Sequence, residues 1–122
     1  MDKYIEVMKR TKELTDTMLE GLEHINELFK DGKYEETIQL FESVVVAYTT
    51  IQNSLEPIKE KLNNGDLEST TKNFNHILEL VVDYYETKDY GRVQEVIQFT
   101  LLPHVKKWRG ELETAFEPFL TS

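Results

Sequence analysis

The chain has 122 residues, a length that predicts a single domain spanning residues 1–122. It contains no cysteine, which excludes disulfide bonds, thiolate metal sites and thiol nucleophiles. Its formal net charge of −9 argues against nucleic acid and against anionic membranes as partners, because both are bound through clustered cations.

Hydropathy along the chain bears on location. No window approaches the ~20 consecutive apolar residues that a membrane-spanning helix requires. The residues from Met1 to Glu6 also lack the apolar segment of a secretory signal. We therefore expect a cytoplasmic protein with no membrane partner.

Residues 2–31 predict a first helix with one apolar stripe. Seven side chains follow each other at alternating steps of three and four, the spacing that keeps them on one helical face. Asp31 and Gly32 then predict the end of the helix, because glycine readily adopts the left-handed conformation found there. The stripe consists of Met8, Thr11, Thr15, Met18, Leu22, Ile25 and Phe29.

A second helix is predicted from Tyr34 to Leu62, ending before the turn signal at residues 63–65. We expect its apolar face to comprise Ile38, Phe41, Val45, Tyr48, Leu55 and Leu62, with a neighbouring row of Leu40, Val44, Ile51 and Ile58.

Two further helices complete the pattern. Asp66 and Asp89 are suited to cap their starts, since an aspartate side chain can accept a hydrogen bond from the first turn. Pro103 lies inside the last apolar stripe, so we expect a bend near Phe99, where the proline removes a backbone hydrogen bond. The stripes are Phe74, Ile77, Leu78, Val81, Tyr84 and Tyr85 in the third helix, and Val93, Val96, Ile97, Leu101, Val105, Trp108, Leu112, Phe116 and Phe119 in the fourth.

Two parts of the chain resemble each other. An offset of 59 residues aligns residues 32–39 with residues 91–98, and each segment stands at the start of the second helix of a pair. Chance similarity is the alternative, because capped amphipathic helices use the same few residue types at the same positions. We predict an all-α antiparallel four-helix bundle built from two helical hairpins, with the last helix kinked near Pro103.

Catalytic and metal chemistry find little support in the sequence. His24 and Glu27, like His76 and Glu79, could share a helical face, but the Glu-x-x-His pattern of helical metal sites is absent. We interpret these pairs as solvated surface. No serine or threonine is marked as a nucleophile, and no glycine-rich phosphate loop occurs. The sequence therefore predicts neither an enzyme nor a cofactor or metal site.

Charge is absent where an exposed helical face would normally carry it. Residues 43–55 contain no acidic or basic side chain, and residues 96–105 contain only His104 as a titratable group. Three explanations stay open for residues 43–55: a helix buried from several sides, a β-branched strand, or a helix with a second face that binds a partner.

The aromatic and basic residues give two local expectations. Tyr84 and Tyr85 point about 100° apart on a helix, so one of them should lie at a boundary or interface. Trp108 should pack its ring inward at a boundary, with the indole N–H near a polar partner. The neighbouring Lys106, Lys107 and Arg109 should complement the acidic helices within the molecule.

These patterns favour a non-catalytic module that binds another protein or a second copy of itself. In size, charge and predicted fold the chain is similar to the small acidic helical chaperones of flagellar and other secretion systems. That likeness implies a chaperone or adaptor role. The alternatives are a structural homodimer of helical hairpins and, with less support, a bundle that binds a small ligand or metal. The predicted partner-binding residues are Val46, Tyr48, Thr50, Gln52, Asn53, Tyr85, Phe99 and Trp108.

Overall fold

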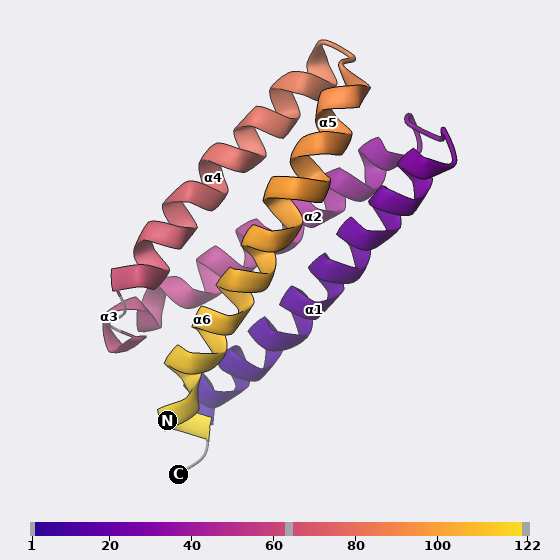
Figure 1. The fold of residues 1–122 in the computed structure, drawn as a ribbon. Coiled ribbons are helices and arrows are strands. Elements are labelled where there is room, and N and C mark those ends of the chain that lie inside the picture. The colour runs from indigo at the N-terminus through magenta and orange to yellow at the C-terminus, as the bar shows by residue number, and fades with distance from the viewer. Residues whose placement is uncertain (1, 63–64, 121–122) are drawn as a thin grey trace.

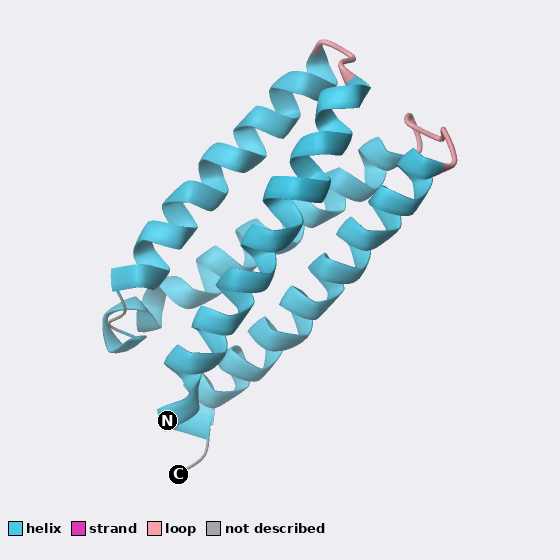
Figure 2. Cartoon of the chain, viewed as in Figure 1, coloured by secondary structure: helices cyan, strands magenta, loops and turns pink. Residues whose placement is uncertain are grey.

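The computed structural model describes residues 2–62 and 65–120, which form four helical rods (Figure 1). Within these ranges the chain is helical apart from the turns, and no strand occurs (Figure 2). The all-α four-helix bundle is confirmed, and the strand alternative for residues 43–55 is wrong. The elements are α1 (Asp2–Lys30), α2 (Thr37–Leu55), the 3₁₀ turn η1 (Glu56–Ile58), α3 (Lys59–Leu62), α4 (Gly65–Glu86), α5 (Tyr90–Val96), the π-helical turn η2 (Ile97–Leu101) and α6 (Leu102–Leu120).

The four rods are not equally close to one another. The backbone of α1 lies against both α2 and α6, and α4 lies against α5, η2 and α6. The backbones of α2 and α4 keep further apart. The side of the bundle between α2 and α4 therefore has to be closed by side chains, and we call it the α2–α4 seam.

The first helix matches the sequence in detail. All seven residues of the predicted stripe, from Met8 to Phe29, are buried. Gly32 takes a left-handed conformation with φ of 76°, and the backbone amides of Gly32 and Lys33 donate to the carbonyls of Phe29 and Leu28 at 3.1 and 2.9 Å. These two bonds form the usual glycine-terminated helix end, so the predicted stop is confirmed.

The second rod differs from its prediction in start and phase. Helix α2 begins at Thr37 rather than Tyr34, and Ile38 is exposed, whereas the predicted stripe buries it. The rod continues through η1 and α3 to Leu62, and the predicted turn at residues 63–64 lies outside the described residues. Its buried row alternates steps of four and three, which keeps it on one face. This row is Thr37, Phe41, Val44, Tyr48, Ile51, Leu55 and Ile58.

The turn between α4 and α5 repeats the bonding of the first turn without its glycine. Lys88 has φ of 58°, and the amides of Lys88 and Asp89 donate to the carbonyls of Tyr85 and Tyr84 at 3.0 and 2.9 Å. Gly91, which the repeat pairs with Gly32, instead lies inside α5. The two hairpins thus share a turn motif, but at a register three residues away from the sequence alignment.

The predicted caps have different outcomes. Asp89 precedes α5, and its carboxylate accepts a hydrogen bond from the backbone N–H of Arg92 at 3.3 Å, as predicted. Asp66 lies within the first turn of α4, which already includes Gly65, so its predicted position at the cap is wrong.

The fourth rod contains a π-helical turn where a bend is predicted. Val93, Ile97, Leu101 and Val105 are all buried and stand four residues apart. In a regular α-helix, three such steps would rotate the stripe by about 120° away from the core. The wider turn at Ile97–Leu101 absorbs that rotation, and the rod continues past Pro103 as α6 (Figure 1). The size of any bend near Phe99 stays a prediction.

Three aromatic rings lie at the centre of the core. Tyr48 stacks on Phe74 with ring centroids 4.2 Å apart, and Trp108 contacts both rings at 5.7 and 5.1 Å. Trp108 is completely buried, and its Nε1 has no hydrogen-bond partner among the described residues. The predicted boundary position of Trp108, with a polar partner for its N–H, is therefore wrong.

Polar contacts add specificity between α4 and α6. The Thr70 hydroxyl donates to the carboxylate of Glu111 at 2.8 Å from both oxygens. His104 Nε2 lies 2.8 Å from the Thr70 carbonyl, which can only accept, so this nitrogen carries the proton. Both bonds fix the position of α6 along its axis relative to the first turns of α4.

Candidate functional site

The uncharged segment 43–55 is divided between core and surface. Its buried members belong to the inward row of α2, while Ser43, Val46, Thr50 and Asn53 are exposed on the opposite side. We call these four residues the outer face of α2. They include the predicted partner-binding residues Val46, Thr50 and Asn53, and the side chain of Val46 is 64% exposed.

The outer face of α2 is less polar than its composition indicates. The hydroxyl of Thr50 donates to the Val46 carbonyl at 2.9 Å, and that of Ser43 donates to the Gln39 carbonyl at 3.2 Å. Since these donors are used within the helix, the face presents methyl groups, one amide and no charge. Such a surface loses little solvation when another protein covers it.

Aromatic side chains close the α2–α4 seam. The Tyr48 hydroxyl donates to the Thr71 carbonyl at 3.3 Å, and the ring of Phe41 lies 5.4 Å from that of Tyr85. The Tyr85 and Thr37 hydroxyls are 2.8 Å apart. Because Thr37 donates its own proton to the Tyr34 carbonyl at 2.6 Å, Tyr85 is the donor in this pair.

Burial of these tyrosines keeps them neutral. It raises the pKa of Tyr48 to about 12. Burial also raises the pKa of Tyr85 to about 12. Tyr48 is only 4% exposed and Trp108 is fully enclosed, so neither predicted partner-binding residue offers a side chain to a partner in this structure. Tyr85 is half-buried.

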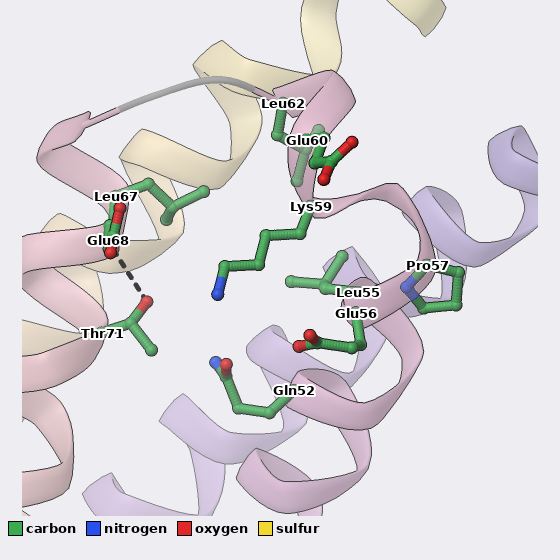
Figure 3. Close-up of a pocket in the computed structure, with 10 residues that line it drawn as sticks. All are labelled: Gln52, Leu55, Glu56, Pro57, Lys59, Glu60, Leu62, Leu67, Glu68 and Thr71. Carbon is green, nitrogen blue, oxygen red and sulfur yellow. Dashed lines mark hydrogen bonds between the residues drawn. The ribbon is translucent and has the colours of Figure 1, made fainter.

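A pocket of about 700 Å³ opens at one end of the seam, where α2, η1 and α3 face the first turns of α4 (Figure 3). We call it the α3 pocket. Gln52, another predicted partner-binding residue, lies on its wall, and the side chain of Lys59 reaches into it. The lining residues are Gln52, Leu55, Glu56, Pro57, Lys59, Glu60, Leu62, Leu67, Glu68 and Thr71.

The α3 pocket has an apolar base and an acidic rim. Leu55 and Leu67 are buried at its base. Glu56, Glu60 and Glu68 supply three carboxylates against the single ammonium group of Lys59. Lys59 forms no ion pair within 4.0 Å in the described part of the chain. The pocket therefore combines apolar area with an excess of negative charge.

The opposite end of the seam is closed by rings from the two turns. Tyr34 stacks on Tyr90 with centroids 5.5 Å apart, and it lies 5.6 Å from Phe29. Tyr90 in turn lies 6.4 Å from Tyr85. This cluster joins the α1–α2 turn to the α4–α5 turn. No pattern in the sequence predicted this contact, although both tyrosines stand next to predicted turns.

The remaining predicted residues lie elsewhere. Phe99 is 70% exposed on η2, in the fourth rod and apart from α2. His24 and His76 are both exposed, on α1 and α4. Within residues 2–62 and 65–120, no group of three or more side chains is arranged to hold a metal ion.

The basic segment near Trp108 behaves partly as expected. Arg109 contacts Asp16 on α1 at 3.2 Å and Glu113 on its own helix at 4.0 Å. Complementarity with an acidic helix is therefore confirmed for Arg109. Among the described helices, none has the length and apolar character needed to cross a membrane.

Comparison with known proteins gives a family without an assigned activity. No curated protein and no solved structure matches the chain. A family model described as a domain of unknown function, DUF8042, matches residues 6–111. The match extends from α1 into α6 and includes the outer face of α2, the α2–α4 seam and the α3 pocket. The chain therefore belongs to the DUF8042 family.

Proposed function

We propose that this protein is a non-catalytic, cytoplasmic interaction module that binds another protein through α2 and the adjoining seam. The observation that carries the proposal is the outer face of α2, where Val46 is 64% exposed and no charged side chain occurs from Ser43 to Leu55. An exposed helix in a chain with 30% charged residues ordinarily carries charge on its solvent side. A neutral face of this kind favours reversible burial against a partner.

The α3 pocket supports the same proposal. It is lined by Gln52 and Leu55 at the end of α2, and it provides a concave, partly apolar site in which a side chain of a partner can be anchored. These features favour a chaperone or adaptor role, because a small acidic bundle with one binding surface can hold a client polypeptide without changing it chemically.

Site-specific photo-crosslinking in the native cell tests the proposal. A photoreactive amino acid at Asn53 should give one or a few discrete adducts, because Asn53 lies on the outer face of α2. The matched control carries the same group at Glu13, which is exposed on α1. Equal labelling from both positions, or none from Asn53, would contradict a binding surface on α2.

The same experiment identifies a homodimer. An adduct of twice the chain's mass, together with a dimer in sedimentation that Val46→Asp converts to a monomer, would assign the surface to self-association. A heterologous adduct from a chain that sediments as a monomer supports the chaperone or adaptor role.

A further inference from the structure

Negative charge is concentrated on the side of the bundle that carries the proposed binding surface. Helices α2 and α4 together contain six acidic residues and one basic residue, a formal charge of −5. Helices α1 and α6 contain ten acidic and eight basic residues, a formal charge of −2. More than half of the net charge of −9 therefore lies on α2 and α4.

One apolar side chain of α4, that of Val82, is exposed on the same side. Thr71, Leu78 and Tyr85, at intervals of seven residues, form the row of α4 that is directed toward α2, as the contacts of Thr71 with Tyr48 and of Tyr85 with Phe41 show. Val82 stands four residues after Leu78 and is 39% exposed. Val82 therefore lies on α4 at the edge of the seam.

The α3 pocket extends this apolar surface and adds charge to it. Leu62 is partly open to solvent above the buried Leu55 and Leu67, and the surrounding rim includes Glu56, Glu60 and Glu68. All three glutamates are exposed, and none forms an ion pair in the described residues. A cationic group from a partner would find carboxylates on both walls, from η1 and α3 on one side and from α4 on the other (Figure 3).

The backbone of this side restricts the conformation of the partner. In both α2 and α4 the peptide groups are hydrogen-bonded within the helix, so neither offers a free edge to an extended strand. A partner that covers the seam must satisfy its own peptide groups, which a helix does. An amphipathic helix also matches an elongated apolar strip with charge along its borders.

We propose that the α2–α4 seam and the α3 pocket bind a basic amphipathic helix of the partner protein. Apolar side chains of that helix enter the α3 pocket and cover Val82, while its lysines and arginines pair with Glu56, Glu60 and Glu68. The ammonium group of Lys59 moves out to solvent as they approach. This inference rests on the proposed function, because it names the partner chemistry for the same side of the molecule.

Peptide binding tests the partner class. The probe is a fluorescein-labelled helical peptide of about 18 residues, with leucines at i, i+3, i+4 and i+7 and lysines on both flanks of the leucine stripe. Two matched peptides replace the lysines by glutamates or scramble the sequence at constant composition. In fluorescence anisotropy, the basic amphipathic peptide should bind at least about tenfold more tightly than either control. Equal binding of the three peptides, or binding of none, would overturn the inference.

Charge-reversal variants locate the site. Glu56→Lys combined with Glu68→Lys should weaken binding of the basic peptide about tenfold, since it reverses the charge on both walls of the α3 pocket. The control is Glu13→Lys combined with Glu20→Lys, which changes the net charge equally on the exposed side of α1. Its effect should stay below about threefold, because solution ions screen distant charges. Equal losses would show non-specific attraction and refute the assigned site.

A third variant keeps the inference testable if the combined Glu56→Lys and Glu68→Lys variant does not fold. Lys59→Glu replaces the one cation among the described lining residues of the α3 pocket and should tighten binding of the same peptide. Weaker binding by a folded Lys59→Glu variant would contradict the inference. The two proposals can be distinguished. If the photoreactive group at Asn53 crosslinks a partner while basic peptides do not bind, the binding surface on α2 is supported and the basic helix is the wrong partner class.

Discussion

Tyr48 and Tyr85 show how single residues couple the seam to stability. Each hydroxyl spans from one helix to the other, Tyr48 to the Thr71 carbonyl and Tyr85 to Thr37. Burial raises the pKa of each from 10.0 to about 12, which means that the folded protein holds these protons more tightly than the unfolded chain. Their contribution to stability is therefore complete below pH 10 and is lost as the pH rises toward 12.

The corresponding prediction concerns alkaline unfolding. The free energy of unfolding should fall between pH 10 and about 12, with Tyr48 alone accounting for on the order of 1–2 kcal/mol. Urea titrations of the wild type and of Tyr48→Phe at several pH values measure this, and the variant should lose less stability across the window. Identical pH profiles would show that Tyr48 does not keep its proton through burial. Comparison with the variant matters because lysines also titrate in this range.

Lys88 and Gly32 allow a second test at the same scale. Both occupy the left-handed position of the same turn motif, with φ of 58° and 76°. A side chain is strained there by roughly 1–2 kcal/mol, whereas glycine is not. Lys88→Gly should therefore raise the free energy of unfolding by about 0.5–1 kcal/mol, after the greater flexibility of glycine in the unfolded chain is subtracted.

The reciprocal change provides the control. A Cβ at Gly32 would meet no atom within 4 Å, so Gly32→Ala has only the backbone strain to overcome. Chemical denaturation should show a loss of about 1 kcal/mol for Gly32→Ala. A loss of stability in Lys88→Gly would indicate that the lysine side chain makes a stabilising interaction larger than the strain.

At the scale of elements, the sequence predicted the helices better than their phases. The stripe of α1 was predictable because its seven residues, five of them apolar, alternate strictly in steps of three and four, although Leu19 beside the stripe is buried as well. In α2 the run Val44, Val45 and Val46 offers three candidates for one inward position. Val44 occupies it and lies against α1 beside Gly21, where a Cβ would stand at an ordinary contact distance of 3.5 Å from the valine Cγ2, so the choice depends on packing between two helices. Single-helix periodicity does not contain that information.

The candidate site was predictable in part for a similar reason. The absence of charge marked Val46, Thr50 and Asn53, and these residues do share an exposed face. Tyr48 lies in the same uncharged segment but belongs to its buried row, and large aromatic side chains such as Tyr48 and Trp108 favour the core as strongly as an interface. The α3 pocket depends on how α3 faces α4, which no local pattern specifies. Gln52 was the only predicted residue on its wall.

The π-helical turn of the fourth rod leads to a third prediction. Since η2 behaves as an α-helix with one inserted residue, deleting the exposed Thr100 should restore regular steps of four, three and four between the buried residues. The deletion variant should still unfold cooperatively, with a loss of at most about 2 kcal/mol. Deleting Glu13 from the regular helix α1 should abolish cooperative unfolding, because it rotates one half of the stripe by about 100°. Thermal melts followed by circular dichroism distinguish the two, and equal loss of cooperativity would contradict this account of η2.

At the scale of the whole molecule, the charge imbalance opposes folding. The net charge is −9, and the described residues contain three ion pairs, all at exposed side chains. Raising NaCl from about 0.05 to about 0.5 M should increase the free energy of unfolding by roughly 0.5–1 kcal/mol, because salt screens repulsion between the acidic groups.

The location of the repulsion can be checked with one variant. Glu79→Lys combined with Glu86→Lys removes two exposed carboxylates from α4, and it should reduce the dependence of stability on salt. Urea titrations at the two salt concentrations give the measurement. An unchanged salt dependence would place the repulsion outside α4.

The stack of Tyr34 on Tyr90 has a mechanical consequence for the bundle. It joins the two hairpins at the end where both turns lie, whereas in the described part of the chain no ring pair spans α2 and α4 between the Tyr48–Phe74 stack and the end of α3. Because the ring contacts stop at Tyr48 and Phe74, separation of α2 from α4 should be easiest beyond the Tyr48–Thr71 hydrogen bond, toward η1 and α3. A partner helix would insert first beside α3. Tyr34→Ala removes the ring contact with Tyr90 and would let the hairpins separate at the turn end as well.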